Sequence, residues 1–176
     1  MGELMDDAER TIRRLRADAR EQREDAEAVA AELATASRSL RDAVLDHARA
    51  GRSIRVEVGP MIFAGRIVHA GADLVRLVGV GRPPVDVVLS GVSGLRTAGS
   101  DRGSATVSTG YPDTLLARCR ELVQVNAGVE IGRHDAPTVR GTLIAATASH
   151  LEVRDNAAVT WFVPIDSAAW VSRIDD

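Results

Sequence analysis

The sequence contains no lysine, so all 22 of its basic residues are arginines. This absence excludes a Walker-type phosphate-binding loop, because that motif needs a lysine to reach the nucleotide phosphates. So strong a bias toward arginine is typical of codon usage in a GC-rich genome, and it suggests a bacterium of the actinobacterial kind. The bias therefore says more about the genome than about the function.

Aromatic residues and cysteine are also scarce. Aromatic residues make up 3% of the chain against an apolar fraction of 45%, so the core must consist mainly of Val, Leu, Ile and Ala. The single cysteine, Cys119, excludes an internal disulfide. Its place at an apolar position of a predicted helix indicates a buried, unreactive thiol rather than a nucleophile.

Neither the charge balance nor any apolar run points to a polyanion or a membrane. Residues 1–50 carry 12 acidic and 9 basic side chains, and residues 51–176 carry 13 of each, so neither part has the basic excess that binds a phosphate backbone. The polar, acidic start MGELMDDAER excludes a secretory signal, and no apolar run is long enough to span a bilayer. We therefore expect a soluble cytoplasmic protein.

Residues 1–50 are predicted to form one long helix. From Glu3 to Ala50 there is neither proline nor glycine, and Ala, Leu, Glu and Arg dominate. The apolar positions fit a heptad with two seams, which are Met5, Ile12, Ala19, Ala26, Leu33 and Leu40, and Ala8, Leu15, Gln22, Val29, Ala36 and Ala43. This pattern indicates a coiled coil or helical hairpin through which the chain self-associates, and the alternative is a solvated helix held by Glu–Arg pairs.

After Gly51, which is expected to end the helix, the hydrophobic period becomes that of a strand, and one pattern occurs twice. The predicted strands of the first copy, residues 51–96, are SIRVEV, FAGRIVHA, DLVRLVGV, VDVVL and VSGLR. Residues 97–111 are small and polar and read as a linker. The second copy, residues 112–176, begins with its own predicted helix, whose apolar stripe is Leu115, Leu116, Cys119, Leu122 and Val123.

Matching residues align the two copies. Gly65 matches Gly141 in mid-strand, where a glycine permits a bend or a close strand approach. The segment VDVVL is aligned with VTWFV, and Leu95 with Trp170. Short, bent antiparallel strands close into a small barrel, which removes exposed edges. The sequence therefore predicts an α+β protein, with a long N-terminal helix followed by two tandem five-stranded antiparallel β-barrels, which either stand apart or pair across the copies.

The V-x-V opening, the mid-strand glycine of FAGRIVHAGADLVRL and the closing VVLSGVSGLR resemble the Sm-like small barrels, the fold of Sm proteins and of the related bacterial RNA chaperone. The resemblance covers Ser53 to Arg96 and, more loosely, Gly128 to Arg173, and it implies RNA binding. The family's contact positions carry other residues here. Its loop aspartate falls on Gly71 and Thr147, its base-stacking aromatic on Asp73 and Ser149, and its Lys-His pair on Leu89 and Ser90 and on Pro164 and Ile165. None of these stacks a base or clamps a phosphate as the originals do.

Candidate site residues are few. The candidate nucleic-acid contacts are five arginines, namely Arg55, Arg66, Arg82, Arg133 and Arg140, because arginine pairs with phosphate and stacks on bases. The alternative is a solvated exterior balanced by carboxylates such as Glu57, Asp86 and Glu130. His69, His134 and His150 raise the idea of a metal- or ligand-dependent sensor. No nucleophile turn, metal-ligand spacing or cofactor motif accompanies them, so we expect neither an enzyme nor a bound cofactor.

Two functions follow from these features. The first is a non-enzymatic, oligomeric interaction or scaffold module, whose tandem barrels bind a protein partner and whose N-terminal helix or barrel edges join copies of the chain. The alternative is an Sm-like RNA- or DNA-binding regulator. The placement of the arginines separates the two hypotheses. Convergence of Arg55, Arg66 and Arg140 on one face favours the regulator, and a carboxylate beside each of them favours the interaction module.

Overall fold

The computed structural model describes residues 20, 22–29, 38–97 and 110–174. Met1–Ser39 and Leu40–Asp176 form two compact units. In the first unit, residues 20 and 22–29 are helical, and Nε of Arg20 donates a hydrogen bond to Glu24, 2.8 Å away and one turn further along. Such pairs stabilise an exposed helix. Most of the two predicted heptad seams lies outside the described residues.

The prediction of one continuous helix to residue 50 is wrong. Arg38 and Ser39 are not helical, and a separate helix, α2 (Leu40–Arg49), begins directly after them. Serine competes with the helix backbone for hydrogen bonds and favours the position just before a helix. Val44 and Ala48 of α2 are buried in the core of the second unit. This helix is therefore part of the unit Leu40–Asp176, which we call the sheet domain.

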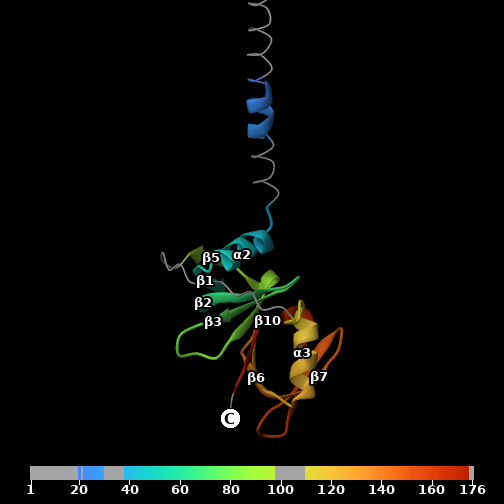
Figure 1. Ribbon diagram of the computed structural model, residues 1–176. Coiled ribbons are helices and arrows are strands. Elements are labelled where there is room, and N and C mark those ends of the chain that lie inside the picture. Colours follow the sequence, from blue (N-terminus) through green and yellow to red (C-terminus); the bar gives the residue numbers. More distant parts are fainter. Residues whose placement is uncertain (1–19, 21, 30–37, 98–109, 175–176) are drawn as a thin grey trace, which may run out of the picture. The chain divides into compact units, whose positions relative to one another are not determined.

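The described part of the sheet domain has ten strands in two sets of five (Figure 1). The first copy contains β1 (Ser53–Val58), β2 (Met61–Ala70), β3 (Leu74–Val78), β4 (Val85–Val88) and β5 (Gly94–Thr97). The second copy begins with helix α3 (Leu115–Gln124) and continues with β6 (Gly128–Arg133), β7 (Val139–Ala146), β8 (His150–Arg154), β9 (Thr160–Pro164) and β10 (Ala168–Arg173). A single 3-10 turn precedes the last strand of each copy, η1 (Leu89–Gly91) and η2 (Ile165–Ser167).

All ten strands form one antiparallel sheet, in the order β5-β1-β2-β3-β4-β10-β6-β7-β8-β9. The prediction of two closed five-stranded barrels is therefore wrong. β4 of the first copy pairs with β10 of the second, so the hydrogen-bonding edges with which each copy would close on itself are used to join the copies instead. Among the described residues, β5 and β9 are the two edge strands.

The strand pairing shows which residues of the two copies are equivalent. Leu74 of β3 lies opposite Val88 of β4, and His150 of β8 lies opposite Pro164 of β9. The segment VDVV that forms β4 therefore corresponds to WFVP in β9, two residues beyond the alignment drawn from the sequence. Because TWFV is apolar without a clear alternation, its pattern alone does not fix the register.

The same comparison corrects the alignment of the last strand. Leu95 of β5 lies opposite Val56 of β1, and Val171 of β10 lies opposite Ile131 of β6. Val56 and Ile131 are equivalent, because each lies two residues after the residue that faces the mid-strand glycine of its copy. Leu95 therefore corresponds to Val171, and not to Trp170 as the sequence alignment had it.

Each copy contributes residues to the core of the other. The buried cluster around β1 to β4 includes Ala169 and Trp170 of β10, and the cluster around α3 and β6 to β10 includes Leu74 and Val88 of the first copy. All four residues of β4 are buried, whereas most of its counterpart β9 is exposed. The helices hold equivalent places, α2 packing on β2 and α3 on β7 (Figure 1). The two copies thus form one structure with a shared interior.

The mid-strand glycines let neighbouring strands approach closely. A Cβ atom at Gly65 would lie 2.5 Å from the carbonyl oxygen of Val78, and one at Gly141 would collide with the carbonyl oxygen of Arg154. The register of β2 with β3 and of β7 with β8 shifts just beyond these positions. A glycine permits the strong local bend that such a register shift produces.

Candidate functional site

The edge strand β9 exposes two large aromatic side chains. Trp161 is 44% exposed and Phe162 is 65% exposed, and Val159 just before the strand is also exposed. The outer side of an edge strand offers a row of backbone donors and acceptors, and large apolar side chains along it add a surface that favours contact with another chain. Of the two edge strands among the described residues, this is the one with exposed large apolar side chains.

Asp155 holds the indole of Trp161 in place at this edge. The Nε1–H of Trp161 donates to Oδ2 of Asp155 at 2.9 Å, and the backbone N–H groups of Ala157 and Val159 donate to Oδ1, each at 2.9 Å. The hydrogen bond from Trp161 has the largest effect, and together with the two backbone bonds it lowers the pKa of the Asp155 carboxyl below its usual value. Asp155 therefore accepts these hydrogen bonds as a carboxylate. The exposed aromatic is therefore an ordered feature of the surface.

The opposite edge, β5, is short and mixed in character. Leu95 packs against the core of the first copy, whereas Arg96 and Thr97 are exposed. Nε of Arg96 lies 3.1 Å from Oε1 of Glu57 on the neighbouring strand β1. The side chain of Glu57 also lies over Gly94, where a Cβ atom would come 2.8 Å from Oε2. The backbone of β5 has no strand partner on its outer side among the described residues.

A buried ionic cluster lies where α3 covers the outer face of β3 and β4. Asp86 is only 3% exposed, and one of its carboxylate oxygens lies 3.0 Å from Nε of Arg118 and 3.3 Å from Nη1 of Arg76. The hydroxyl of Tyr111 lies 2.8 and 2.9 Å from the two carboxylate oxygens, and both guanidinium groups lie over the Tyr111 ring, 4.5 and 5.0 Å from its centre. The carboxylate is thus satisfied from several sides.

Burial dominates the electrostatics of this cluster. It raises the pKa of Asp86 above the usual value, although Arg76 and Arg118 act in the opposite direction. Burial also lowers the pKa of Arg76. Because Asp86 is enclosed by α3 and by residues of both copies, it is out of reach of a substrate, and the cluster acts as a link between the copies.

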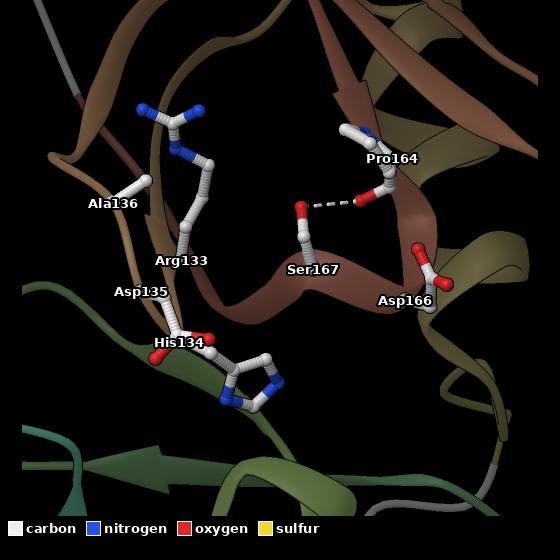
Figure 2. Close-up of a pocket in the computed structure, with 7 residues that line it drawn as sticks. All are labelled: Arg133, His134, Asp135, Ala136, Pro164, Asp166 and Ser167. Carbon is white, nitrogen blue, oxygen red and sulfur yellow. Dashed lines mark hydrogen bonds between the residues drawn. The ribbon is translucent and has the colours of Figure 1, made fainter.

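A surface hollow of about 590 Å³ lies beside η2 (Figure 2). Its lining residues are Arg133, His134, Asp135, Ala136, Pro164, Asp166 and Ser167. Two of its polar groups are already engaged, since Nε of Arg133 donates to the carbonyl of Pro137 and the Ser167 hydroxyl donates to the carbonyl of Pro164, each at 2.8 Å. The remaining charges are of both signs, so the hollow has no clear preference for a cation or an anion.

The five candidate arginines do not form one surface. Arg55 and Arg66 share the outward face of β1 and β2, since Arg55 lies opposite Ala64 and Arg66 follows two residues later. Nη2 of Arg140, on β7, lies 2.9 Å from Glu130. Arg82 lies in the exposed turn between β3 and β4, and Arg133 borders the hollow described above.

The three candidate histidines lie in separate environments. His69 is buried against the Tyr111 ring, 5.0 Å between ring centres, and its Nε2 lies 3.6 Å from Asp113. His150 contacts Ser149 and Thr147 through Nδ1, at 2.9 and 3.1 Å. Nowhere in the described ranges do three or more His, Cys, Asp or Glu side chains gather in a way that could hold a metal ion.

Sequence reasoning missed the most connected polar residues of the domain. Tyr111 and Arg118 were not candidates. The placing of Asp86 among the carboxylates of a solvated exterior is wrong, since it is 3% exposed and is the one charge inside the apolar segment VDVVL. A charge in a strand that is otherwise wholly apolar predicts a buried partner, because an isolated buried carboxylate is strongly destabilising. That signal was available, but it did not reveal that the partner lies on α3.

No family model matches this chain, and a search of curated proteins finds no match either. Among the helices that are described, none is long and apolar enough to cross a membrane.

Proposed function

We propose that this protein is a non-enzymatic interaction module that binds a protein partner by strand addition at the edges of its sheet. The observation that carries the proposal is the outer side of β9, which has no strand partner among the described residues and whose strand carries the exposed Trp161 and Phe162. In strand addition, the backbone of the partner completes the hydrogen-bond ladder, and alternate side chains give specificity.

The character of β9 supports this proposal. Exposed edge strands are usually protected by charged side chains, bulges or very short length. The five residues of β9, TWFVP, carry no charge, and the only proline is the last of them. At the other edge, β5 has only four residues and carries a charged Arg96. An edge that keeps exposed aromatics and lacks this protection is suited to pairing with another polypeptide.

The module is non-enzymatic and cytoplasmic in this proposal. The strongest cluster of ionisable groups, around Asp86, is enclosed and already satisfied, so it offers no group for proton transfer to a bound substrate. The single thiol, Cys119, is free and buried, which is compatible with a reducing compartment. The resemblance to Sm-like small barrels stays a prediction.

One observation favours nucleic-acid binding as the second candidate function. Arg55 lies directly opposite Arg96, on the outward face that also carries Arg66, which gathers three arginines on one surface of the first copy. The ion pairs Arg96–Glu57 and Arg140–Glu130 reduce the charge available to a phosphate backbone. Fluorescence anisotropy with a labelled single-stranded RNA tests this candidate, and binding that weakens steeply with salt would favour it over the interaction module.

The proposed function is tested by photo-cross-linking in intact cells. A photoreactive phenylalanine analogue is placed at Phe162, and a matched probe is placed at Val80, which is fully exposed but lies in the turn between β3 and β4. Protein adducts are expected from position 162 and not from position 80. Equal adducts from both positions, or nucleic-acid adducts from position 162, would overturn the proposed function.

A further inference from the structure

The junction between the two copies joins β4, the fourth strand of the first copy, to β10, the fifth strand of the second copy. In the antiparallel pairing of β4 with β10, Trp170 lies opposite Val87, Val171 opposite Asp86, and Ser172 opposite Val85. Each of these residues is at most 7% exposed. The junction is therefore a dry contact between two equivalent units, and it happens to lie within one chain.

The free edges are the counterparts of the strands in this junction. β9 is equivalent to β4, and β5 is equivalent to β10, as the register of each copy shows. Transferring the register of the junction to the free edges gives three new pairs, which are Gly94 opposite Val163, Leu95 opposite Phe162, and Arg96 opposite Trp161. Within one domain these two strands lie at opposite ends of the sheet, so only strands from two chains can pair in this way without refolding.

The large side chain lies on a different strand at the free edges than in the internal junction. In the internal junction the large residue, Trp170, is on β10 and lies opposite Val87 of β4. At the free edges Gly94 takes the place of Trp170, and the large residue, Trp161, takes the place of Val85 on the other strand. In the transferred register Trp161 would lie directly opposite Arg96 and diagonally across from Gly94, so the guanidinium of Arg96 would lie beside the indole ring.

The helix that precedes each copy supplies a second contact. Leu115, at the start of α3, is buried with Leu74 and Val88 of the first copy, and its backbone N–H donates to Oδ1 of Asp73 at 2.8 Å. Leu40 begins α2 in the equivalent place, and it is 38% exposed. In a pair of chains, α2 of the second chain would place its Leu40 against β8 and β9 of the first chain. Within one chain, α3 places Leu115 against β3 and β4 in the same way.

The same comparison explains why β9 carries an aromatic. Phe162 is the counterpart of Asp86, which pairs with Arg118 of α3 at 3.0 Å. The residue of α2 at the place of Arg118 is Ala43. In a contact built like the internal junction, Phe162, which is 65% exposed, would therefore face a small apolar alanine in the place where Asp86 faces an arginine.

We propose that the partner of β9 is β5 of a second copy of this chain, with Leu95 opposite Phe162. The proposal rests on the proposed function and names its partner. The contact is head to tail, so each added chain again presents a free β9 and a free β5. Such heterologous contacts produce closed rings when the rotation between subunits closes, and filaments when it does not. A second copy thereby covers Trp161, Phe162 and Leu40 together.

The test is disulfide trapping between two differently labelled chains. Chains carrying Leu95→Cys are mixed with chains carrying Phe162→Cys and oxidised, since directly opposed residues of antiparallel strands lie within disulfide range. The native Cys119 is buried and does not compete. A second pair, Arg96→Cys with Trp161→Cys, uses exposed positions only, in case the half-buried Leu95 does not tolerate replacement.

The expected result is a mixed disulfide-linked dimer from both in-register pairs, at least ten times more abundant than from the out-of-register control, Leu95→Cys with Trp161→Cys. Equal yields from the control, or no mixed dimer from either pair, would overturn the second copy as partner. If the photoreactive probe at position 162 then attaches to a different protein, the proposed function stands without this inference. If that probe also attaches to nothing, both fail.

Discussion

The ring of Phe63 and the indole of Trp170 meet edge to face, with ring centres 5.2 Å apart and an angle of 66° between their planes. Phe63 belongs to β2 of the first copy and Trp170 to β10 of the second. The indole also lies directly over Gly132, where a Cβ atom would collide with it. The second copy thus completes the core of the first, and neither copy is expected to be stable without the other.

Replacing Trp170 with Ala is expected to reduce the free energy of unfolding of the sheet domain by about 3–5 kcal/mol, since it removes a large buried aromatic and leaves a cavity. Because the cores are shared, urea unfolding is expected to remain a single transition by circular dichroism. Trp161→Phe is the control, with little change in stability. Two separate unfolding transitions would contradict a shared core.

Arg118→Met is expected to reduce the free energy of unfolding at pH 7 by about 1.5–3 kcal/mol, the usual range for a hydrogen bond to a charged group. The reason is that the buried carboxylate of Asp86 loses one of its two cationic partners. Arg140→Met is the matched control, because it removes an ion pair whose arginine is largely exposed, and its effect is expected to stay below about 1 kcal/mol. Equal losses in the two variants would show that burial of the cluster is unimportant.

The pH dependence of stability is expected to show the raised pKa of Asp86. The folded protein binds a proton at this site more tightly than the unfolded chain, in which the pKa is near 3.8, so this contribution to stability falls as the pH rises from there through the folded pKa. Asp86→Asn cannot release a proton. In urea titrations, the free energy of unfolding of the wild type minus that of Asp86→Asn is therefore expected to be largest at acidic pH and to decrease toward neutral pH. A difference that widens with pH would mean that the arginines outweigh burial.

Cys119 is expected to resist thiol reagents in the folded protein. Burial raises the pKa of its thiol to about 12, so almost no thiolate is present at neutral pH. Labelling with a disulfide reagent is expected to proceed only after urea unfolds the sheet domain. Fast labelling of the native protein, at the rate of an exposed thiol, would show that α3 opens readily from the sheet.

The sequence predicted the local structure well where the hydrophobic period is clear. The strand SIRVEV coincides with β1, and the mid-strand glycines Gly65 and Gly141 lie where strands approach closely. The sheet as a whole was not predictable, because the pairing of β4 with β10 joins residues that are far apart in the sequence. Two barrels that pair across the copies and two that stand apart have the same alternation of residues along each strand.

The candidate site was less predictable than the strands. The arginines were chosen by residue type, and only the register shows that Arg55 and Arg66 share a face while Arg140 pairs with Glu130. The aromatics of β9 were not among the candidates, since nothing in the segment TWFV tells an edge strand from a central one. Exposure of Trp161 and Phe162 depends on which strand lies beside β9, which is a property of the whole sheet.

The most direct test of the account is the mass of the protein in solution, measured by sedimentation over a range of concentrations. The wild type is expected to exceed the 18.7 kDa of one chain increasingly with concentration, and Phe162→Lys to lower that mass. Ile62→Lys, at a residue of similar exposure away from the sheet edges, is expected to leave it unchanged. Identical masses for the wild type and Phe162→Lys at every concentration would contradict the account.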